Sequence, residues 1–407
     1  MAIAADFDDL TFSCSSTRYI GPIGTSIEEV LGSFGSNVKA TVDMTVDGAT
    51  RTGILIEGSR TNVQFYSQQF DQYDTDQVTV NTNDTGTDDP LGTNTADEVV
   101  PSTNYNDHFI RKWITTFDEN TPEGTWAASI FGKDNGYDLR MRHQHTGDQT
   151  DVNYDLSAKS VGSTSGIIDS GADDASDGWC FCWYTRDIND CAAYEWLRSE
   201  FLALDGTDYY FTGDGSSAFW GWQAQFEFGE WPSSIIPNSG TSDVTRAAAN
   251  GYWDSTDVTS NLRGKITLYI IPEFGSAQLY DTSTEEQVLL HFDDATQDIK
   301  IYLEPGTSAD TGRIVVDGAS ALVTSGNHTW SRGQILKIVI DPGEGDIITS
   351  LFTTGNGTHS GTSWSTDDGD VYLGQSSSNA DHFFGLLFEP EYEEAAIEEA
   401  LFFGRFI

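Results

Sequence analysis

The chain has 407 residues and is strongly acidic, with 64 Asp and Glu against 20 Lys and Arg and a formal charge of −44. This length exceeds that of one compact core and predicts two or three domains. The negative field repels phosphate backbones, so nucleic acid and anionic membranes are unfavourable partners, and the simplest role of the charge is solubility. The 23 Phe, 16 Tyr and 11 Trp argue against disorder, because disordered chains are poor in aromatic residues.

The composition predicts an all-β protein. Gly, Ser and Thr are abundant, and segments with helical periodicity are scarce. No run of about 18 apolar residues is present, so no membrane insertion is expected, and the N-terminus lacks the basic and apolar regions of a secretory signal. We expect two jelly-roll-like β-sandwich domains, at 51–247 and 251–407, preceded by a short N-terminal attachment or docking segment at 1–50.

Acidic residues crowd the polar run at 64–94, which has few apolar anchors. Asp71, Asp74 and Asp76 are the candidate ligands for a structural calcium ion, because Ca²⁺ binds six to eight oxygen atoms of carboxylates and carbonyls. No complete calcium-loop motif with its distal Glu is present. The alternative is a solvated acidic loop, and no other cofactor is expected.

Strands of the first domain are predicted at 108–117, 125–133, 137–145, 152–156, 178–186 and 207–213. Within 137–145, alternation places Arg140, Arg142 and Gln144 on one face. Arg and Gln side chains hydrogen-bond sugar hydroxyls and carboxylates, so this face is a candidate carbohydrate-binding surface. The alternative is that the arginines pair with neighbouring carboxylates.

Residues 178–204 contain two further local patterns. Cys180 and Cys182 lie two apart in a strand, too close along the chain to bridge each other, and we interpret them as buried thiols and not as zinc ligands. The stretch 192–204 keeps Tyr194, Leu197 and Leu204 roughly on one stripe and predicts a helix.

The stretch 219–246, FWGWQAQFEFGEWPSSIIPNSGTSDVTR, organises the first domain. Its first half alternates, so Trp220, Trp222, Ala224 and Phe226 are expected on one strand face, with Gln223, Gln225 and Glu227 on the other. Gly229 ends the strand. Two prolines then predict an irregular exit segment over 230–238.

Two motifs in this domain resemble a β-sandwich module of tailed-phage fibre and spike proteins. The later one comprises Gln225-x-Glu227-x-Gly229, the segment SSIIPN at 233–238, and Thr245-Arg246; here Ile236 and Asn238 stand where the module has Tyr and Thr. The earlier one, GILIEGSRTN at 53–62, is similar to the module's opening, and LTFSCSSTRY at 10–19 echoes the segment before it. The resemblance implies a virion structural protein and usually a homotrimer.

The second domain begins after a short linker at 247–251. Strands are predicted at 264–271, 287–292, 298–303, 312–317, 334–340, 346–353, 369–374 and 383–389. The order of KIVID at 337–341, VYLG at 371–374 and GLL at 385–387 resembles a concanavalin A-like or laminin G-like sandwich. The tail at 391–407 has apolar residues at helical spacing and predicts a short amphipathic helix.

Catalytic constellations are absent from the sequence: it has no G-x-S-x-G, no H-E-x-x-H and no phosphate-binding loop. Carboxylate pairs are too frequent to identify a glycosidase. Trp364, Trp330 and Tyr372 are the candidate aromatic residues for sugar binding in the second domain, and the alternative for Trp364 is packing beneath its loop.

These observations favour a non-enzymatic structural protein of a tailed bacteriophage, displayed as a fibre, spike or head decoration. It would bind host-surface polysaccharide without cleaving it, contact other virion proteins, and be located in the virion after assembly in the host cytoplasm. One alternative is a purely structural capsid-decorating or connector protein with only virion partners. Another is a polysaccharide depolymerase.

Overall fold

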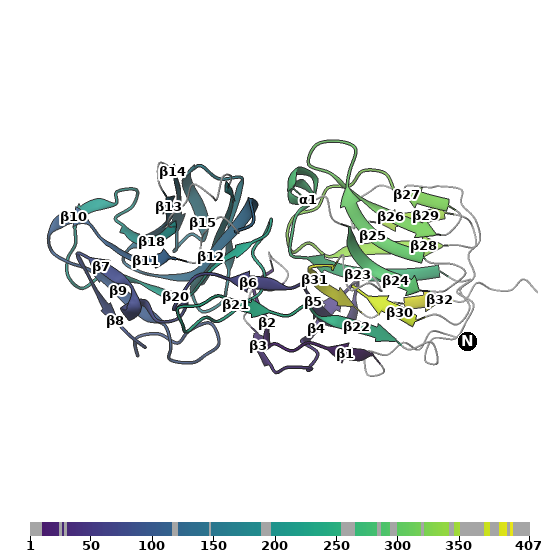
Figure 1. Cartoon of the computed structure of the whole chain (residues 1–407), viewed down its shortest axis with the longest axis horizontal. Coiled ribbons are helices and arrows are strands. Elements are labelled where there is room, and N and C mark those ends of the chain that lie inside the picture. The colour runs from purple at the N-terminus through teal and green to yellow at the C-terminus, as the bar shows by residue number, and fades with distance from the viewer. Residues whose placement is uncertain are drawn as a thin grey trace, which may run out of the picture.

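Strands form most of the residues that the structure describes, as the composition predicts. The computed structural model describes residues 10–23, 27, 31–115, 121–145, 148–188, 197–253, 265–282, 286–293, 299–318, 321–341, 346–350, 370–374, 382–388 and 391–393. These residues form two β-sandwiches that lie side by side (Figure 1). Within them, no helix has the length and hydropathy of a membrane span.

The first sandwich packs a six-stranded sheet on an eight-stranded one. The six-stranded sheet has the order β15 (Ser160–Ser165), β14 (Asp148–Asp155), β13 (Asp138–His145), β18 (Leu197–Leu204), β11 (Phe109–Ile114), β7 (Asp74–Asp76). The other runs β16 (Asp169–Asp174), β17 (Trp179–Ile188), β12 (Gly124–Asn135), β20 (Ala218–Phe228), β6 (Arg60–Asn62), β21 (Val244–Arg246), with β9 (Asp97–Pro101) on β20 and β8 (Val78–Asn81) on β9. A separate ribbon joins β10 (Tyr105–Asp107) to β19 (Tyr210–Thr212), and a 3-10 turn covers Phe70–Gln72.

The second sandwich also has two sheets. One runs β1 (Thr11–Ser13), β22 (Asn250–Trp253), β30 (Asp370–Leu373), β24 (Gln287–Asp293), β25 (Ile299–Pro305), β26 (Gly312–Gly318), β27 (Ala321–Thr324). The other runs β29 (Asp346–Ser350), β28 (Leu336–Asp341), β23 (Lys265–Pro272), β31 (Gly385–Phe388), β5 (Ala49–Ile56), β4 (Thr41–Val46), with β32 (Glu391–Glu393) on β23. The pair β2 (Arg18–Ile20) and β3 (Leu31–Phe34) and the helix α1 (Ser276–Thr282) complete the elements.

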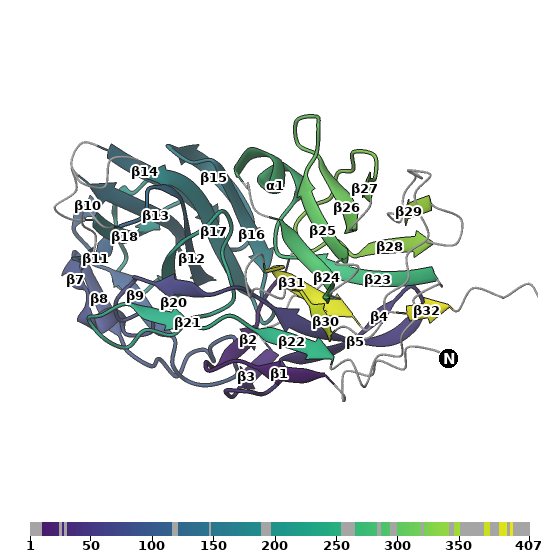
Figure 2. The ribbon, with the colours of Figure 1, turned by 45° about the vertical axis from the view of Figure 1, so that its right-hand side comes forward.

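The N-terminal residues belong to the second sandwich, so the first is an insertion within it. β1 pairs with β22, and β5 pairs with β31, near the other end of the chain (Figure 2). The chain enters the first sandwich through β6 and leaves it through β21, and these two strands pair with Arg60 opposite Arg246. The predicted boundary at residue 51 therefore falls inside a strand of the second sandwich. The described part of 1–50 is built into that sandwich and is not a separate docking segment.

Apolar side chains from facing sheets fill each sandwich. In the first, Leu139 and Met141 of β13 lie fully buried against Ile130 of β12 and Phe226 of β20. In the second, β5 contributes Ile54 and Ile56 to the core, while its Leu55 faces a smaller apolar cluster with residues of the N-terminal segment. This alternation is the period of two that the sequence shows.

A bulge in β20 corrects the predicted faces of the central strand. Gln223 has φ of 53°, and the register against β12 shifts between Ser129 and Phe131. An extra residue in a strand moves the following side chains to the opposite face. Trp222 therefore packs on the outer face of the sheet, whereas Ala224 and Phe226 face the core.

The helix predicted at 192–204 is wrong over its described part, because residues 197–204 form the strand β18. β18 lies between β11 and β13 within the sheet, and seven of its eight side chains are buried. A run that is buried on both faces has no clear strand periodicity. The helix predicted at 391–407 lies outside the described residues from 394 onward, and Glu391–Glu393 is a short strand.

Candidate functional site

The three segments that carry the sequence motifs meet at one buried junction between the sandwiches. Residues 10–19, 53–62 and 225–246 are far apart in the chain, yet each contributes a side chain that hydrogen-bonds the backbone of another of these segments. The junction lies on the outer face of the eight-stranded sheet, where β20 and the exit segment approach the second sandwich.

Glu57 and Arg246 form a fully buried ion pair, with Nη1 of Arg246 3.2 Å from Oε1 of Glu57. Glu57 also accepts hydrogen bonds from the backbone N–H of Ser234 at 2.8 Å and from its hydroxyl at 2.7 Å. Arg246 donates to the Ser234 carbonyl at 3.0 Å and to the Gly58 carbonyl at 3.4 Å. The pair thus fixes the exit segment against the end of β5.

Glu227 holds the same exit segment from the strand β20. Its carboxylate accepts from the backbone N–H and the hydroxyl of Ser233, each at 2.7 Å, and from Nε2 of Gln225 at 2.7 Å. Oε1 of Gln225 accepts the N–H of Ile236 at 2.8 Å. The Q-x-E spacing places both side chains on one face of the strand, where they satisfy the backbone of a segment that has no strand partner.

Asn62, Arg60 and Gly229 complete the junction. Asn62 donates to the Ile236 carbonyl at 2.8 Å and accepts the N–H of Phe226 at 3.1 Å. Arg60 donates to the Phe228 carbonyl, and a Cβ at Gly229 would lie 1.7 Å from its Nη1. Gly229 has φ of 149° and no side chain, so the guanidinium fits against the chain there.

The N-terminal segment contributes Arg18, which is fully buried. Its guanidinium donates to the sulfur of Cys14 at 2.9 Å and to the carbonyls of Leu55 at 3.2 Å and Ala247 at 3.3 Å. Burial lowers the pKa of Arg18, and the nearby Glu57 opposes that shift. The described motif residues therefore form a buried joint between the segments.

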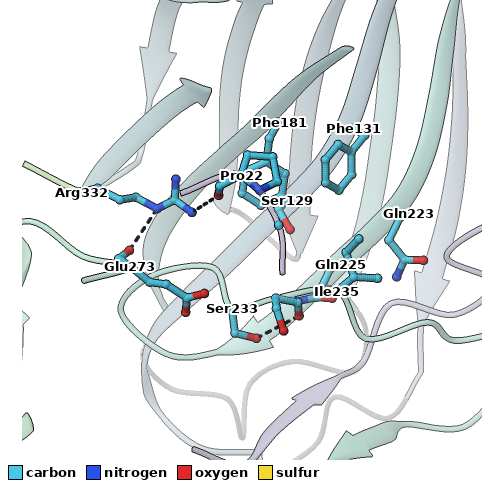
Figure 3. A pocket seen from close by; sticks show the side chains of 12 residues that line it. Pro22, Ser129, Phe131, Phe181, Gln223, Gln225, Ser233, Ile235, Glu273 and Arg332 are labelled. Atoms are coloured by element: carbon cyan, nitrogen blue, oxygen red, sulfur yellow. Dashed lines mark hydrogen bonds between the residues drawn. The ribbon is translucent and has the colours of Figure 1, made fainter. Parts of the chain in front are cut away.

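A pocket lies beside this joint, between the two sandwiches (Figure 3). Its cavity volume is about 10 Å³, which is room for about one water molecule. Phe131 and Phe181 form an aromatic wall, with ring centroids 4.9 Å apart. Gln223, Glu273 and Arg332 supply polar groups to the lining.

Arg332 crosses from the second sandwich to the first at the edge of the pocket. It forms an ion pair with Asp173 of β16 and donates to the carbonyls of Glu273 at 3.0 Å and Pro22 at 2.9 Å. Its guanidinium carbon lies 5.7 Å from the centroid of the Phe181 ring. The arginine is therefore occupied by protein partners from both sandwiches.

Gln223 and Glu273 carry buried polar atoms without partners. Neither Nε2 nor Oε1 of Gln223 has a hydrogen-bond partner, and the residue is 2% exposed; Oε2 of Glu273 is likewise unpartnered at 3% exposure. Burial, and then the charge of Glu57, raise the pKa of Glu273 well above its usual range. Both effects favour the neutral form of this carboxyl group over the charged form.

The predicted face of Arg140, Arg142 and Gln144 lies on the six-stranded sheet. Its arginines pair with groups of the same chain, which is the alternative to sugar binding given above. Arg142 contacts Asp151 at 2.7 Å and Glu200 at 3.2 Å, and Arg140 donates to Asn153 at 2.6 Å. Gln144 accepts from Arg198. These side chains are satisfied by their cross-strand neighbours and leave little capacity for a ligand.

The two aromatic candidates that the structure describes, Trp330 and Tyr372, lie in different surroundings. Trp330 is 6% exposed in the core of the second sandwich, and its indole N–H donates to the Phe274 carbonyl at 3.1 Å. Tyr372 lies in β30, with its ring centroid 5.7 Å from that of Tyr252 and 5.9 Å from that of His291. Trp364 lies outside the described residues.

The three aspartates proposed for calcium lie in two neighbouring elements, the 3-10 turn and β7. Asp71 is in the 3-10 turn and accepts from Gln72 at 2.7 Å, while Asp74 in β7 lies 3.5 Å from the Arg111 guanidinium. Asp76 lies at the other end of β7. Across the described residues, no group of three or more His, Cys, Asp or Glu side chains could hold a metal ion.

The interpretation of the cysteines as buried thiols is confirmed where they are described. Cys14, Cys180 and Cys182 are free and buried, and the sulfurs of Cys180 and Cys182 are 3.5 Å apart. Burial raises the pKa of Cys182 well above its usual range, so its thiol is protonated and unreactive.

Three exposed tyrosines were not among the residues that the sequence patterns indicated. Tyr105 is 68% exposed, Tyr210 is 47% and Tyr209 is 40%. They lie on the β10–β19 ribbon or directly before it, on the side of the first sandwich away from the second (Figures 1 and 2). Their neighbours in the sequence, in STNYND and GTDYYF, could have indicated this exposure. An aromatic residue among small polar residues is seldom part of a core.

The tyrosine rings face solvent in two arrangements. Tyr105 and Tyr210 form an edge-to-face pair with centroids 4.7 Å apart. The Tyr209 ring lies over the Arg140 guanidinium at 4.4 Å. Exposed Asp205 and Asp208 flank them.

Comparisons with known proteins identify no family. No family model and no curated protein matches the chain. Among solved structures, domains LG4-5 of the mouse laminin alpha1 chain align at 12% identity with a TM-score of 0.21, covering 72% of this chain and 88% of that one. So low a score carries no argument about function.

Proposed function

We propose that the protein is a non-enzymatic structural component of a tailed-phage particle that binds neutral host-surface polysaccharide. The observation that carries the binding role is the group of exposed tyrosines, Tyr105, Tyr209 and Tyr210, at the free end of the inserted sandwich. The phage assignment rests on the motif resemblance, and the homotrimer that this resemblance implies is part of the proposal.

The chemistry at this end of the molecule favours a neutral glycan. Aromatic rings bind the apolar face of a sugar, and nearby polar groups bind its hydroxyls. Tyrosine supplies a large contact area at low conformational cost, because its side chain has few rotatable bonds. The flanking carboxylates of Asp205 and Asp208 repel an anionic polymer, and the formal charge of −44 does so over the whole chain.

The buried joint supports a structural role. Glu57, Glu227 and Arg246 each bind protein partners, and these contacts support a fixed relation between the two sandwiches. A rigid joint would keep the tyrosine end at a defined distance from the second sandwich. This arrangement suits a protein that is displayed on a particle.

A glycan array tests the binding role. We expect the full chain to bind neutral polysaccharides and the double variant Tyr105→Ala/Tyr210→Ala to bind about tenfold more weakly, because two ring contacts are lost. The matched control is Tyr105→Phe/Tyr210→Phe, which keeps both rings and should keep most of the affinity. Absence of glycan binding by the wild type would contradict the binding role.

Electron microscopy of phage particles labelled with antibody against this chain tests the virion role. Label at the tail, the fibres or the head surface is the expected result. Particles that carry label but a protein that binds no glycan would favour a connector or decoration protein with only virion partners.

A further inference from the structure

The exposed face of the β10–β19 ribbon presents four side chains in a two-by-two pattern. Tyr105 lies directly opposite Thr212, and Asp107 lies directly opposite Tyr210. Residues that are opposite each other in an antiparallel pair share one face, and so do residues two apart along a strand. The two tyrosine rings therefore occupy one diagonal of the pattern, and a carboxylate and a hydroxyl group occupy the other.

The opposite face of the ribbon is anchored to the first sandwich. Phe211 is 5% exposed, and its ring centroid lies 4.9 Å from that of Tyr137 and 4.6 Å from that of His108. The two ring nitrogens of His108 lie 2.8 Å from the Gln77 carbonyl oxygen and 3.1 Å from the Phe211 carbonyl oxygen. These contacts hold the ribbon from behind, so its exposed face is arranged before a ligand binds and little ordering is needed on binding.

The polar groups of the exposed face have no protein partner among the residues that the structure describes. No hydrogen bond or ion pair there involves the carboxylate of Asp107, the hydroxyl of Thr212 or either tyrosine hydroxyl. On the six-stranded sheet, in contrast, Arg142 is bound by both Asp151 and Glu200. The ribbon face therefore has free hydrogen-bonding capacity directly beside two exposed aromatic rings.

The chemistry of this face selects a neutral ligand that is rich in hydrogen-bond donors. The carboxylate of Asp107 accepts hydrogen bonds and repels other anions. Its two oxygens match two adjacent hydroxyl groups, and such charge-assisted bonds are stronger than bonds between neutral groups. The rings of Tyr105 and Tyr210 are inclined at 83° to each other, so a sugar ring can stack on one of them while its edge contacts the other.

We propose that the ribbon face binds a neutral hexopyranose unit with two adjacent free hydroxyl groups, and that Asp107 determines this specificity. The sugar ring packs on one of the tyrosine rings, its adjacent hydroxyl groups donate to the carboxylate of Asp107, and Thr212 binds a further oxygen. The inference rests on the proposed glycan-binding function, to which it adds the class of sugar and the residue that selects it.

Isothermal titration calorimetry on the full chain tests the inference, with maltohexaose, cellohexaose and mannohexaose as separate probes. We expect at least one probe to bind the wild type and to bind Asp107→Asn about tenfold more weakly, because charge-assisted hydrogen bonds are lost. The matched control is Asp208→Asn, which removes an exposed carboxylate outside the ribbon and should leave the affinity unchanged. An O-methylated form of the same probe keeps its sugar rings but lacks hydroxyl donors, so it should also bind at least about tenfold more weakly.

Thr212→Val keeps the test valid if Asp107→Asn does not fold. It removes one hydroxyl group at nearly constant shape and should weaken the sugar about fivefold. Equal affinity of the wild type and Asp107→Asn, or of the free and the methylated probe, would overturn the inference while the glycan-binding role stands. Failure of all three probes would also overturn it, and failure of the whole glycan array would overturn the proposed function as well. Binding of choline in place of the sugars would assign the face to a cation and contradict the inference.

Discussion

Replacing Glu57 by Gln is expected to destabilise the protein severely. The carboxylate is fully buried and accepts three hydrogen bonds or ion-pair contacts, from Ser234 twice and from Arg246 at 3.2 Å. Glutamine keeps the shape but removes the charge, so the Arg246 guanidinium stays buried without its counter-ion. Removing one partner of a buried ion pair lowers the free energy of unfolding by about 3–5 kcal/mol.

Urea unfolding followed by tryptophan fluorescence measures this loss, because Trp231 packs at the same junction, 5.8 Å from the Arg60 guanidinium carbon. The matched control is Asp74→Asn, which breaks an ion pair whose side chains are 34% and 60% exposed and should cost about 0–1 kcal/mol. The double variant Glu57→Gln/Arg246→Met should recover part of the stability, since no lone charge remains. A loss below about 1 kcal/mol for Glu57→Gln would refute the reasoning.

Three other outcomes follow from the fold. Burial, and then the charge of Arg186, lower the pKa of His143 to about 3, whereas the unfolded value is about 6.5. The contribution of neutral His143 to the free energy of unfolding is therefore full above pH ~6.5 and falls below it, by up to about 1.4 kcal/mol per pH unit. Urea titrations of the wild type and of His143→Phe at each pH measure this loss. A fragment 251–407 lacks β1, β4 and β5, so its circular dichroism should show an unfolded chain, and fusion of residues 1–58 to it should restore strand signal. Cys180 and Cys182 should react with a thiol reagent only after denaturant is added, and reaction of either in the native protein would contradict the buried strand.

Most strands could be predicted from the sequence because their signal is local. The segments GKITLYII and DIKIYL are short apolar runs bounded by turn residues, and they are β23 and β25. The helix predicted at 192–204 failed because β18 is buried on both faces, and such a strand has no alternation to distinguish it from a helix.

The domain order could not be predicted because pairing between distant segments leaves no local mark. The sequence of β5 resembles the start of the first module, yet this strand pairs with β31, more than 300 residues away in the chain. The bulge at Gln223 could not be predicted either. The sequence around it alternates regularly between Trp, Gln, Ala and Phe, and this pattern does not indicate an extra residue.

The candidate site residues of the sequence and the buried joint of the fold are different sets. The motif residues Glu57, Glu227 and Arg246 were recognised in the sequence, although only the fold shows that they bind one another. Arg142 was considered as a sugar ligand, and its two carboxylate partners come from strands β14 and β18, whose alignment the sequence does not specify.

Incubation of the full chain with purified neutral surface polysaccharide, with bound polymer and new reducing ends measured in the same sample, tests the central claim of glycan binding without cleavage. We predict saturable binding and no increase in reducing ends. Release of reducing ends, or no binding at any concentration of polymer, would contradict the account.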